Sequence, residues 1–340
     1  MKKINTQSFW IKKKNDSYIK NHNIDLPNGK ELLIKTVYSG ISYGTEKIVY
    51  AGSVPKSQKE LMRCPYQEGS FGSDVKYGYM NIGMVMDGSP DFKGKYVYTL
   101  FPHQKDYVLD ESEVTLIPES IPLKRCLLTA NMETVINGMW DTLPSCGDKI
   151  LVVGSGVVGF LMAYLLKTIP GCEILLVDSD AKKSKFSKMF DINFKTTIPS
   201  NYKANIIYEC SGNADIINSL SKHVMDEATI CILSWYGDNT SKVKFGEEFL
   251  SKRIKFIFSQ VSKVSHNRNK YWDNIKRREL AISMLNDDRL DHLIEQKMID
   301  FSKLPTFFSK TVKYKGFFCK VVNLLRKGFK ILVKQLYSDL

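Results

Sequence analysis

Hydrophobic and polar residues follow two different periods along the chain, and the change of period separates a β-rich first third from a mixed remainder. In the first third, short apolar runs are bounded by turn residues such as Asp87-Gly88-Ser89-Pro90 and Lys93-Gly94-Lys95. These runs predict strands at residues 31–38, 80–86, 96–100, 107–109 and 114–117. Short strands of this spacing are typical of an irregular, barrel-like module.

From Pro122 onward the apolar positions take helical spacing and then alternate with short buried strands. Helices are predicted at residues 124–140, 157–167, 182–190, 214–224 and 273–285. Strands are predicted at residues 150–153, 173–177, 206–210, 229–234 and 255–259. This alternation indicates a doubly wound parallel sheet, so the predicted fold class is α/β.

One strand-to-helix turn carries a dinucleotide-binding motif, in which three glycines with the spacing GxGxxG follow a buried strand. Gly154 permits a tight turn, Gly156 lets the backbone approach a pyrophosphate, and Gly159 lets helix and strand pack closely. The following helix N-terminus offers free N–H groups to the phosphates. The predicted phosphate-binding residues are Gly154, Ser155, Gly156, Val157, Val158 and Gly159. The alternative is an empty βαβ unit with a glycine-rich turn.

Asp178 follows the second strand of this unit and predicts which cofactor binds. Its carboxylate can accept hydrogen bonds from the adenine ribose and would repel a 2′-phosphate. Ser179 stands where a phosphate would need an arginine. NAD(H) is therefore favoured over NADP(H), although Lys182 and Lys183 lie close enough to weaken the discrimination.

Loops at the carboxyl ends of parallel strands line a dinucleotide site, so two more loops are candidates. The predicted cofactor contacts there are Cys210, Ser211, Gly212, Ser234 and Trp235. Trp235 and Tyr236 either cover the nicotinamide or an aromatic substrate, or belong to an interface.

Composition and charge narrow the class of protein. The apolar share of 43% is that of a globular protein. No run approaches the roughly 18 apolar residues of a transmembrane helix, and the charged N-terminus has no apolar segment behind it. Seven cysteines, an odd number without a CxxC pair, favour reduced thiols in a cytoplasm. The net charge of +13 comes from lysines interleaved with acids, which indicates solvated faces and no nucleic-acid partner.

The order of these parts resembles the medium-chain dehydrogenase/reductase superfamily, with a GroES-like catalytic domain and an inserted Rossmann domain. The resemblance covers about residues 32–323. It is carried by the nucleotide motif and by the stretches SGISYGTE (39–46), KYGY (76–79), GKYV (94–97), ET (133–134) and ECSG (209–212). The variants SGISxGTE, LFPHQ and LSWYGD look most like the bacteriochlorophyllide-dehydrogenase-like branch.

This resemblance implies two domains, which the chain length also favours. The predicted limits are residues 1–121 for the first part of the GroES-like domain, 122–262 for the Rossmann domain, 263–322 for the return to the GroES-like domain and 323–340 for a basic C-terminal extension. Residues 324–334 of the extension have a cationic amphipathic pattern. Such a helix either lies on an anionic membrane or, more commonly, packs on its own protein.

The chain departs from the zinc-dependent members of this superfamily at their metal ligands. Tyr43 stands where they have a zinc-binding cysteine, and Tyr79 stands where they have a histidine. Glu133 matches an acidic third ligand of some members. One carboxylate does not make a zinc site, which usually needs about three protein ligands. The four-cysteine lobe for a structural zinc is also missing, so no zinc is expected.

Without zinc, hydride transfer still needs groups that polarise a carbonyl and move a proton. The hydroxyls of Tyr43 and Tyr79 either stabilise a developing alkoxide or merely fill the volume of the absent metal shell. Thr45 either relays protons or caps the following helix. Glu46 is a structural acceptor or a catalyst.

Imidazole is a common acid–base group, and His103 lies at a strand end, so it is an acid–base candidate or a structural histidine. Glu133 either holds a tyrosine or histidine in place or is a helix-surface charge. The predicted catalytic residues are Tyr43, Thr45, Tyr79, His103 and Glu133.

Together these features predict a zinc-independent oxidoreductase. It would transfer hydride between NAD(H) and an alcohol or carbonyl group on a fairly bulky small-molecule substrate. The alternatives are an enone or quinone reductase of the same superfamily and a non-catalytic dinucleotide-binding protein. The resemblance implies an oligomer, and a homodimer is expected.

Overall fold

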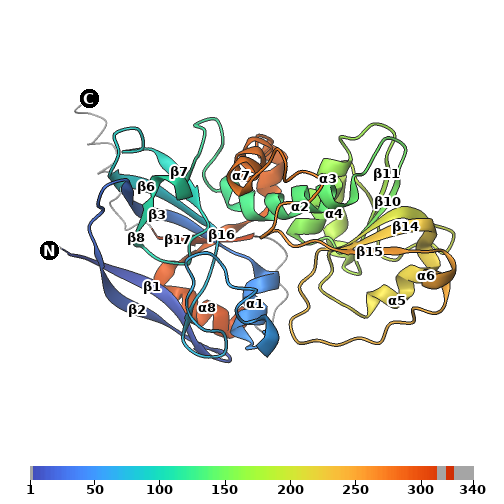
Figure 1. The fold of residues 1–340 in the computed structure, drawn as a ribbon, viewed down its shortest axis with the longest axis horizontal. Helices are drawn as coiled ribbons and strands as arrows, with labels where there is room; N and C mark the ends of the chain where they lie inside the picture. The colour runs from blue at the N-terminus through green and yellow to red at the C-terminus, as the bar shows by residue number, and fades with distance from the viewer. Residues whose placement is uncertain (1–2, 312–318, 325–340) are drawn as a thin grey trace.

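The computed structural model describes residues 3–311 and 319–324, and the predicted amphipathic extension therefore lies almost wholly outside the described residues. Figure 1 shows two lobes, with helices α2 and α7 where they meet. None of the helices in the described ranges is long and apolar enough to cross a bilayer.

The first lobe is built on two sheets. The larger has seven strands, β16-β17-β3-β6-β7-β9 in order, with β8 paired to β3. Its strands are β3 (Glu31–Ile41), β6 (Asn81–Asp87), β7 (Tyr96–Thr99), β8 (Asp106–Asp110), β9 (Thr115–Leu116), β16 (Ile294–Asp300) and β17 (Cys319–Asn323). The smaller contains β1 (Lys3–Lys13), β2 (Asp16–Asp25), β4 (Glu68–Gly69) and β5 (Val75–Lys76). Helices α1 (Tyr43–Tyr50) and α8 (Leu304–Thr311) pack on this lobe through an aromatic core.

The second lobe is a six-stranded parallel sheet with the order β12-β11-β10-β13-β14-β15. Its strands are β10 (Lys149–Val153), β11 (Glu173–Val177), β12 (Asn193–Lys195), β13 (Ala204–Glu209), β14 (Val224–Ile232) and β15 (Lys255–Phe258). Its helices are α2 (Thr129–Thr142), α3 (Val157–Leu166), α4 (Ser184–Met189), α5 (Ile216–Leu220), α6 (Glu248–Ser251) and α7 (Asn274–Ser283). The predicted α/β fold class with a β-rich lobe is confirmed.

The strand register brings the predicted cofactor residues together at the carboxyl ends of the strands of this sheet. Val153, the last residue of β10, lies opposite Val177 of β11 and Glu209 of β13. The turns that follow these strands therefore begin side by side. An open parallel sheet binds its ligand outside these carboxyl ends.

Asp287, which follows helix α7 in the chain, makes a hydrogen-bonded contact with helix α3 of the second lobe. Asp287 accepts a hydrogen bond from Tyr164 of α3 at 3.1 Å and from Arg289 at 2.6 Å. Hydrogen bonding to Arg289, against the effect of burial, lowers the pKa of Asp287 to about 2. Because its folded pKa is depressed, this carboxylate stabilises the fold above its usual pKa and loses that effect as pH falls through about 2.

Asp287→Asn is therefore expected to lower the free energy of unfolding by about 1 kcal/mol at neutral pH, because Arg289 is 49% exposed and solvent weakens the pair. The difference from the parent chain should shrink between about pH 4 and pH 2. Urea unfolding at several pH values measures it. Asp288→Asn, at the exposed next position, is the matched control, and a difference that stayed constant with pH would contradict the assignment.

Candidate dinucleotide and substrate site

The three motif glycines are needed for different reasons. Gly154 has φ +95°, and a Cβ there would lie 2.6 Å from the Ser211 Cα. A Cβ on Gly159 would lie 1.8 Å from the Gly154 carbonyl oxygen. A Cβ on Gly156 would meet no atom within 4 Å. Gly154 and Gly159 are thus required by the fold, whereas Gly156 faces space that a ligand can enter.

The beginning of α3 has unused hydrogen-bonding capacity. Gly156 is its N-cap and supplies no side-chain cap, so the N–H groups of Val157 and Val158 precede the first helical acceptor. Ser155 is fully buried, and its Oγ has no hydrogen-bond partner among the described residues. A pyrophosphate would accept hydrogen bonds from these donors, so the turn fits a dinucleotide.

Asp178 lies beside this turn and is already engaged. It accepts hydrogen bonds from Ser155 N at 2.8 Å and Asp180 N at 3.0 Å, and Lys183 Nζ lies 2.7 Å from its Oδ2. Burial opposes ionisation, but these hydrogen bonds outweigh it and lower the pKa of Asp178. The carboxylate is charged, and Lys183 is its counter-ion.

The loops after β13 and β14 are linked by a buried acid that the sequence analysis did not select. Glu209 accepts hydrogen bonds from Ser211 N at 2.7 Å and from the Tyr236 hydroxyl at 2.6 Å. Gly212 N donates to Ser234 Oγ at 2.9 Å. These bonds hold the predicted cofactor loops together. In the sequence, this arrangement could be recognised from an acid at the end of a buried strand with a serine two positions later.

Two other predicted residues in these loops have apolar surroundings. Burial raises the pKa of the Cys210 thiol well above its usual range, so it is no nucleophile near neutral pH. Trp235 is partly buried against the aromatic core of the first lobe. Trp235 thus contacts the GroES-like lobe from the nucleotide sheet.

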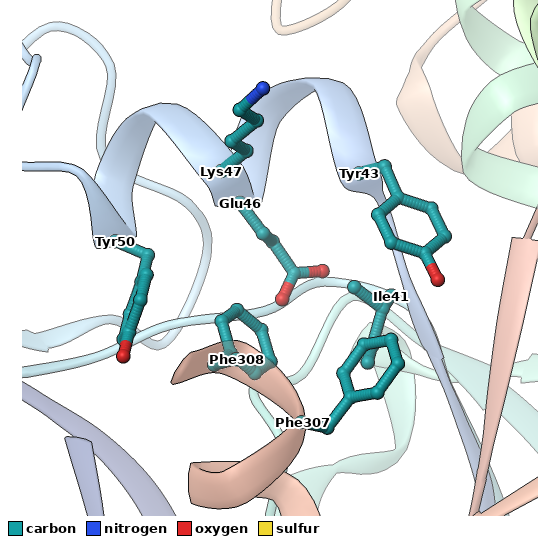
Figure 2. Close-up of a pocket in the computed structure, with 7 residues that line it drawn as sticks. All are labelled: Ile41, Tyr43, Glu46, Lys47, Tyr50, Phe307 and Phe308. Carbon is teal, nitrogen blue, oxygen red and sulfur yellow. The ribbon is translucent and has the colours of Figure 1, made fainter. Parts of the chain in front are cut away.

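The two predicted tyrosines have different neighbours. Tyr43 projects from α1 towards Phe307 of α8 (Figure 2), with ring centroids 6.1 Å apart. Its hydroxyl is hydrogen-bonded with Glu295. The adjoining cavity has about 10 Å³, room for no more than a water molecule. Burial, and then Glu295, raise the pKa of Tyr43. The cavity between Tyr43 and Phe307 is therefore too small for a substrate.

Tyr79, in contrast, meets Thr45. Its hydroxyl is hydrogen-bonded with the side chains of Ser42 and Thr45 at the start of α1. Burial raises the pKa of Tyr79 despite these two bonds, so the phenol stays protonated at neutral pH. The structure thus places the side chains of two predicted catalytic residues, Tyr79 and Thr45, within hydrogen-bond distance of each other.

His103 is the centre of a buried three-residue chain. Its Nε2 lies 2.9 Å from Glu46 Oε2, and its Nδ1 lies 2.7 Å from Ser39 Oγ. All three side chains are at most 2% exposed. Glu46 Oε1 also accepts a hydrogen bond from Ser42 N at 2.8 Å, which fixes the beginning of α1. His103 is thus connected to Tyr79 and Thr45 through Glu46 and this helix end.

Glu133 is buried between arginines rather than exposed on a helix surface. It is 2% exposed, with Arg277 Nε 3.4 Å from its Oε1 and Arg278 Nε 3.5 Å from its Oε2. Burial raises the pKa of Glu133, and the two guanidinium groups oppose that rise. Its partners are two arginines, not the tyrosine or histidine that the sequence suggested.

The donor groups do not assemble into a metal site. Within residues 3–311 and 319–324, no three His, Cys, Asp or Glu side chains lie together in a way that could hold a metal ion. Glu46 and His103 satisfy each other, and Glu133 is held by arginines. We therefore assign no step to a metal.

Comparisons with known proteins agree with this geometry, although no family model matches the chain. The 2-desacetyl-2-hydroxyethyl bacteriochlorophyllide A dehydrogenase of Cereibacter sphaeroides is 24% identical over 233 residues, which are 62% of this chain and 68% of that protein. The enzyme of the same name from Rhodobacter capsulatus is 26% identical over 213 residues, 57% of this chain and 62% of that protein.

Solved structures match over nearly the whole chain. L-idonate 5-dehydrogenase from Escherichia coli has a TM-score of 0.77 at 13% identity, covering 95% of this chain and 99% of its own. Staphylococcus aureus TarJ in complex with NADPH has a TM-score of 0.70 at 16% identity, covering 95% and 100%. An alcohol dehydrogenase (rspB) from E. coli complexed with NADH has a TM-score of 0.72 at 14% identity, covering 94% and 99%. The resemblance is therefore confirmed for the fold: over nearly its whole length the chain has the fold of these dehydrogenases.

Proposed function

We propose that this chain is a zinc-independent oxidoreductase that transfers hydride between NAD(H) and an alcohol or carbonyl group. The observation that carries the proposal is the turn at Gly156, where open space meets the free N–H groups of α3 and the orphaned Ser155 hydroxyl. Solved neighbours complexed with NADH or NADPH support a nicotinamide cofactor. The cofactor, when bound, supplies or accepts the hydride.

The chain's own residues would hold the cofactor and manage the proton. The α3 N-terminus and Ser155 bind the pyrophosphate, and Asp178 binds the adenine ribose. Tyr79 donates a hydrogen bond to the oxygen that gains negative charge, because its raised pKa keeps it protonated. Thr45, hydrogen-bonded to Tyr79, would orient that phenol.

The proposal is tested by titrating metal-analysed protein with NADH while nicotinamide fluorescence is recorded. Saturable NADH binding without stoichiometric zinc, followed by turnover of an alcohol or ketone, is the expected result. Turnover of enones or quinones alone would favour the alternative reductase. Cofactor binding without any turnover would favour a non-catalytic role. Stoichiometric zinc would overturn the zinc-independent chemistry.

Lys183 offers a test of cofactor preference. A 2′-phosphate beside Asp178 needs a nearby cation, and the Lys183 ammonium is the group paired with that acid. Lys183→Met is expected to weaken NADPH binding about tenfold, because a charge-assisted contact is lost. NADH binding should change less. Lys182→Met, at the exposed neighbouring position, is the control. Equal losses for both nucleotides would show that Lys183 does not discriminate between them.

A second copy of the chain is the partner that we propose. The last strand of the nucleotide sheet, β15, is an edge strand, and Phe258 at its end is 72% exposed. An unpaired edge with an exposed aromatic ring favours association. A cytoplasmic location and the absence of nucleic-acid or membrane partners belong to the same proposal.

A further inference from the structure

A second cavity lies beside the two segments that connect the lobes. It has a volume of about 400 Å³ and is lined by Tyr38, by residues 122–124, by Asp291 and by residues 294–296. Residues 122–124 lie between β9 and α2, where the chain leaves the first lobe, and residues 291–296 lead from α7 back into β16. Tyr38 belongs to β3, and β17 lies between β3 and β16. An occupant of this cavity would therefore contact both connecting segments.

The cavity has the size and the walls of a site for a small organic molecule. Ligand pockets have volumes of about 300–1,000 Å³ and are lined mainly by apolar side chains with a few polar groups. Pro122, Leu123 and Ile294 supply apolar surface here. Leu123 and Tyr38 also pack together on one small apolar cluster of the first lobe. The walls are thus suited to the apolar body of a ligand.

The cavity is separate from the proposed dinucleotide site. Its lining residues all lie outside the turns that follow β10, β11, β13 and β14. Those turns carry the residues that we propose for the pyrophosphate, the ribose and the nicotinamide. A molecule in this cavity would therefore not occupy the place of the cofactor.

Both acids of the cavity are already paired with cations of the protein. Asp291 accepts two hydrogen bonds from Arg125, each at 2.9 Å. Glu295 Oε2 lies 2.7 Å from Lys320 Nζ. Arg125 and Lys320 are only 5% and 7% exposed, so each cation is committed to its acid. The two carboxylates therefore leave little negative charge for a ligand to meet.

Lys124, in contrast, lines the cavity without an opposite charge. Its ammonium lies over the ring of Tyr38, 5.7 Å from the ring centroid, and it forms no ion pair with any acid of residues 3–311 and 319–324. The face of a tyrosine ring attracts a cation but does not neutralise it. A carboxylate would accept a charge-assisted hydrogen bond from this ammonium. The charge that remains in the cavity is therefore positive.

We propose that this cavity binds a small organic anion, a carboxylate on an aromatic or aliphatic body. Lys124 holds the carboxylate, and Leu123 and Ile294 contact the apolar body. The inference goes beyond the proposed oxidoreductase function, because this ligand is neither the cofactor nor a molecule held at Tyr79.

Calorimetric titration of the full chain with 2-naphthoate, with and without NADH, tests the site. The parent chain should bind naphthoate saturably, and naphthylmethylamine, which has the same rings and a positive charge, should bind about tenfold more weakly or less. Lys124→Met should weaken naphthoate binding about tenfold, because the charge-assisted contact is lost. Lys124→Arg should keep most of the affinity, since it keeps the charge. Lys297→Met, at an exposed position of β16 outside the cavity lining, is the control and should change nothing.

Lys124→Glu gives the sharpest outcome, because it should reverse the preference between the two probes within one variant. Equal naphthoate affinity in the parent chain and Lys124→Met would overturn the inference, as would no saturable binding by the parent chain. Displacement of naphthoate by NADH would overturn it too, because the probe would then occupy the dinucleotide site. A chain that binds no NADH would contradict the oxidoreductase proposal, while naphthoate binding that depends on Lys124 would still support this site.

Discussion

Replacing Gly159 by alanine is expected to destabilise the nucleotide-binding lobe and to abolish NADH binding. The new Cβ would lie 1.8 Å from the carbonyl oxygen of Gly154, a backbone atom that cannot rotate away. Helix α3 would have to move off the turn that its own N-terminus completes. Overpacking of this kind costs about 1–3 kcal/mol, and a backbone clash belongs at the upper end. Urea unfolding and nicotinamide fluorescence measure the two effects.

Gly156→Ala is the matched variant, because it tests the cofactor contact without a clash in the fold. Its Cβ meets no atom within 4 Å, and the residue has an ordinary negative φ of −74°. The fold should therefore be as stable as that of the parent chain, while NADH affinity falls about tenfold or more because the methyl group occupies the pyrophosphate's approach. Gly246→Ala, also without close neighbours, should change neither property. Unchanged NADH affinity in Gly156→Ala would place the cofactor elsewhere.

The strands of the molecule differ in how well the sequence alone predicts them. The motif and its flanking strands are local, so a buried apolar run predicted β11 with its observed bounds, Glu173–Val177. Strand β2 was not predicted, because it has no buried residue and so no apolar alternation. Strand β16 is similarly polar, with one buried residue. Burial produces the periodic signal, and exposed strands lack it.

The candidate site divides in the same way. The phosphate turn could be predicted because its residues are neighbours in the chain. The partners of His103 could not, since Glu46 is 57 positions and Ser39 is 64 positions away along the chain. Arg277 reaches Glu133 across 144 positions. Strand pairing and lobe packing create these contacts, so they cannot be predicted from the spacing of residues along the chain.

The second large effect is a loss of stability, which we expect when the buried pair of His103 and Glu46 is broken. His103→Leu would leave the Glu46 carboxylate, 2% exposed, without its imidazole partner. Breaking a buried pair by removing one member costs about 3–5 kcal/mol, because the remaining charge is uncompensated. Glu46→Gln/His103→Leu should be more stable than His103→Leu alone, since an amide tolerates burial better than a carboxylate. Urea unfolding of the single and double variants gives the coupling energy.

This cycle also separates the two roles that the sequence left open for His103. If His103 acts by positioning, Glu46→Gln with His103 intact should keep much of the activity, because the amide oxygen can accept from Ser42 N while the amide nitrogen donates to an imidazole whose Nε2 carries no proton. If His103 donates a proton to substrate, Glu46→Gln/His103→Leu should stay inactive although the double change recovers stability. The second outcome is not expected, because His103 is only 1% exposed and both ring nitrogens already have protein partners. This agrees with the proposal that Tyr79 serves the proton, while Glu46 and His103 fix the start of α1.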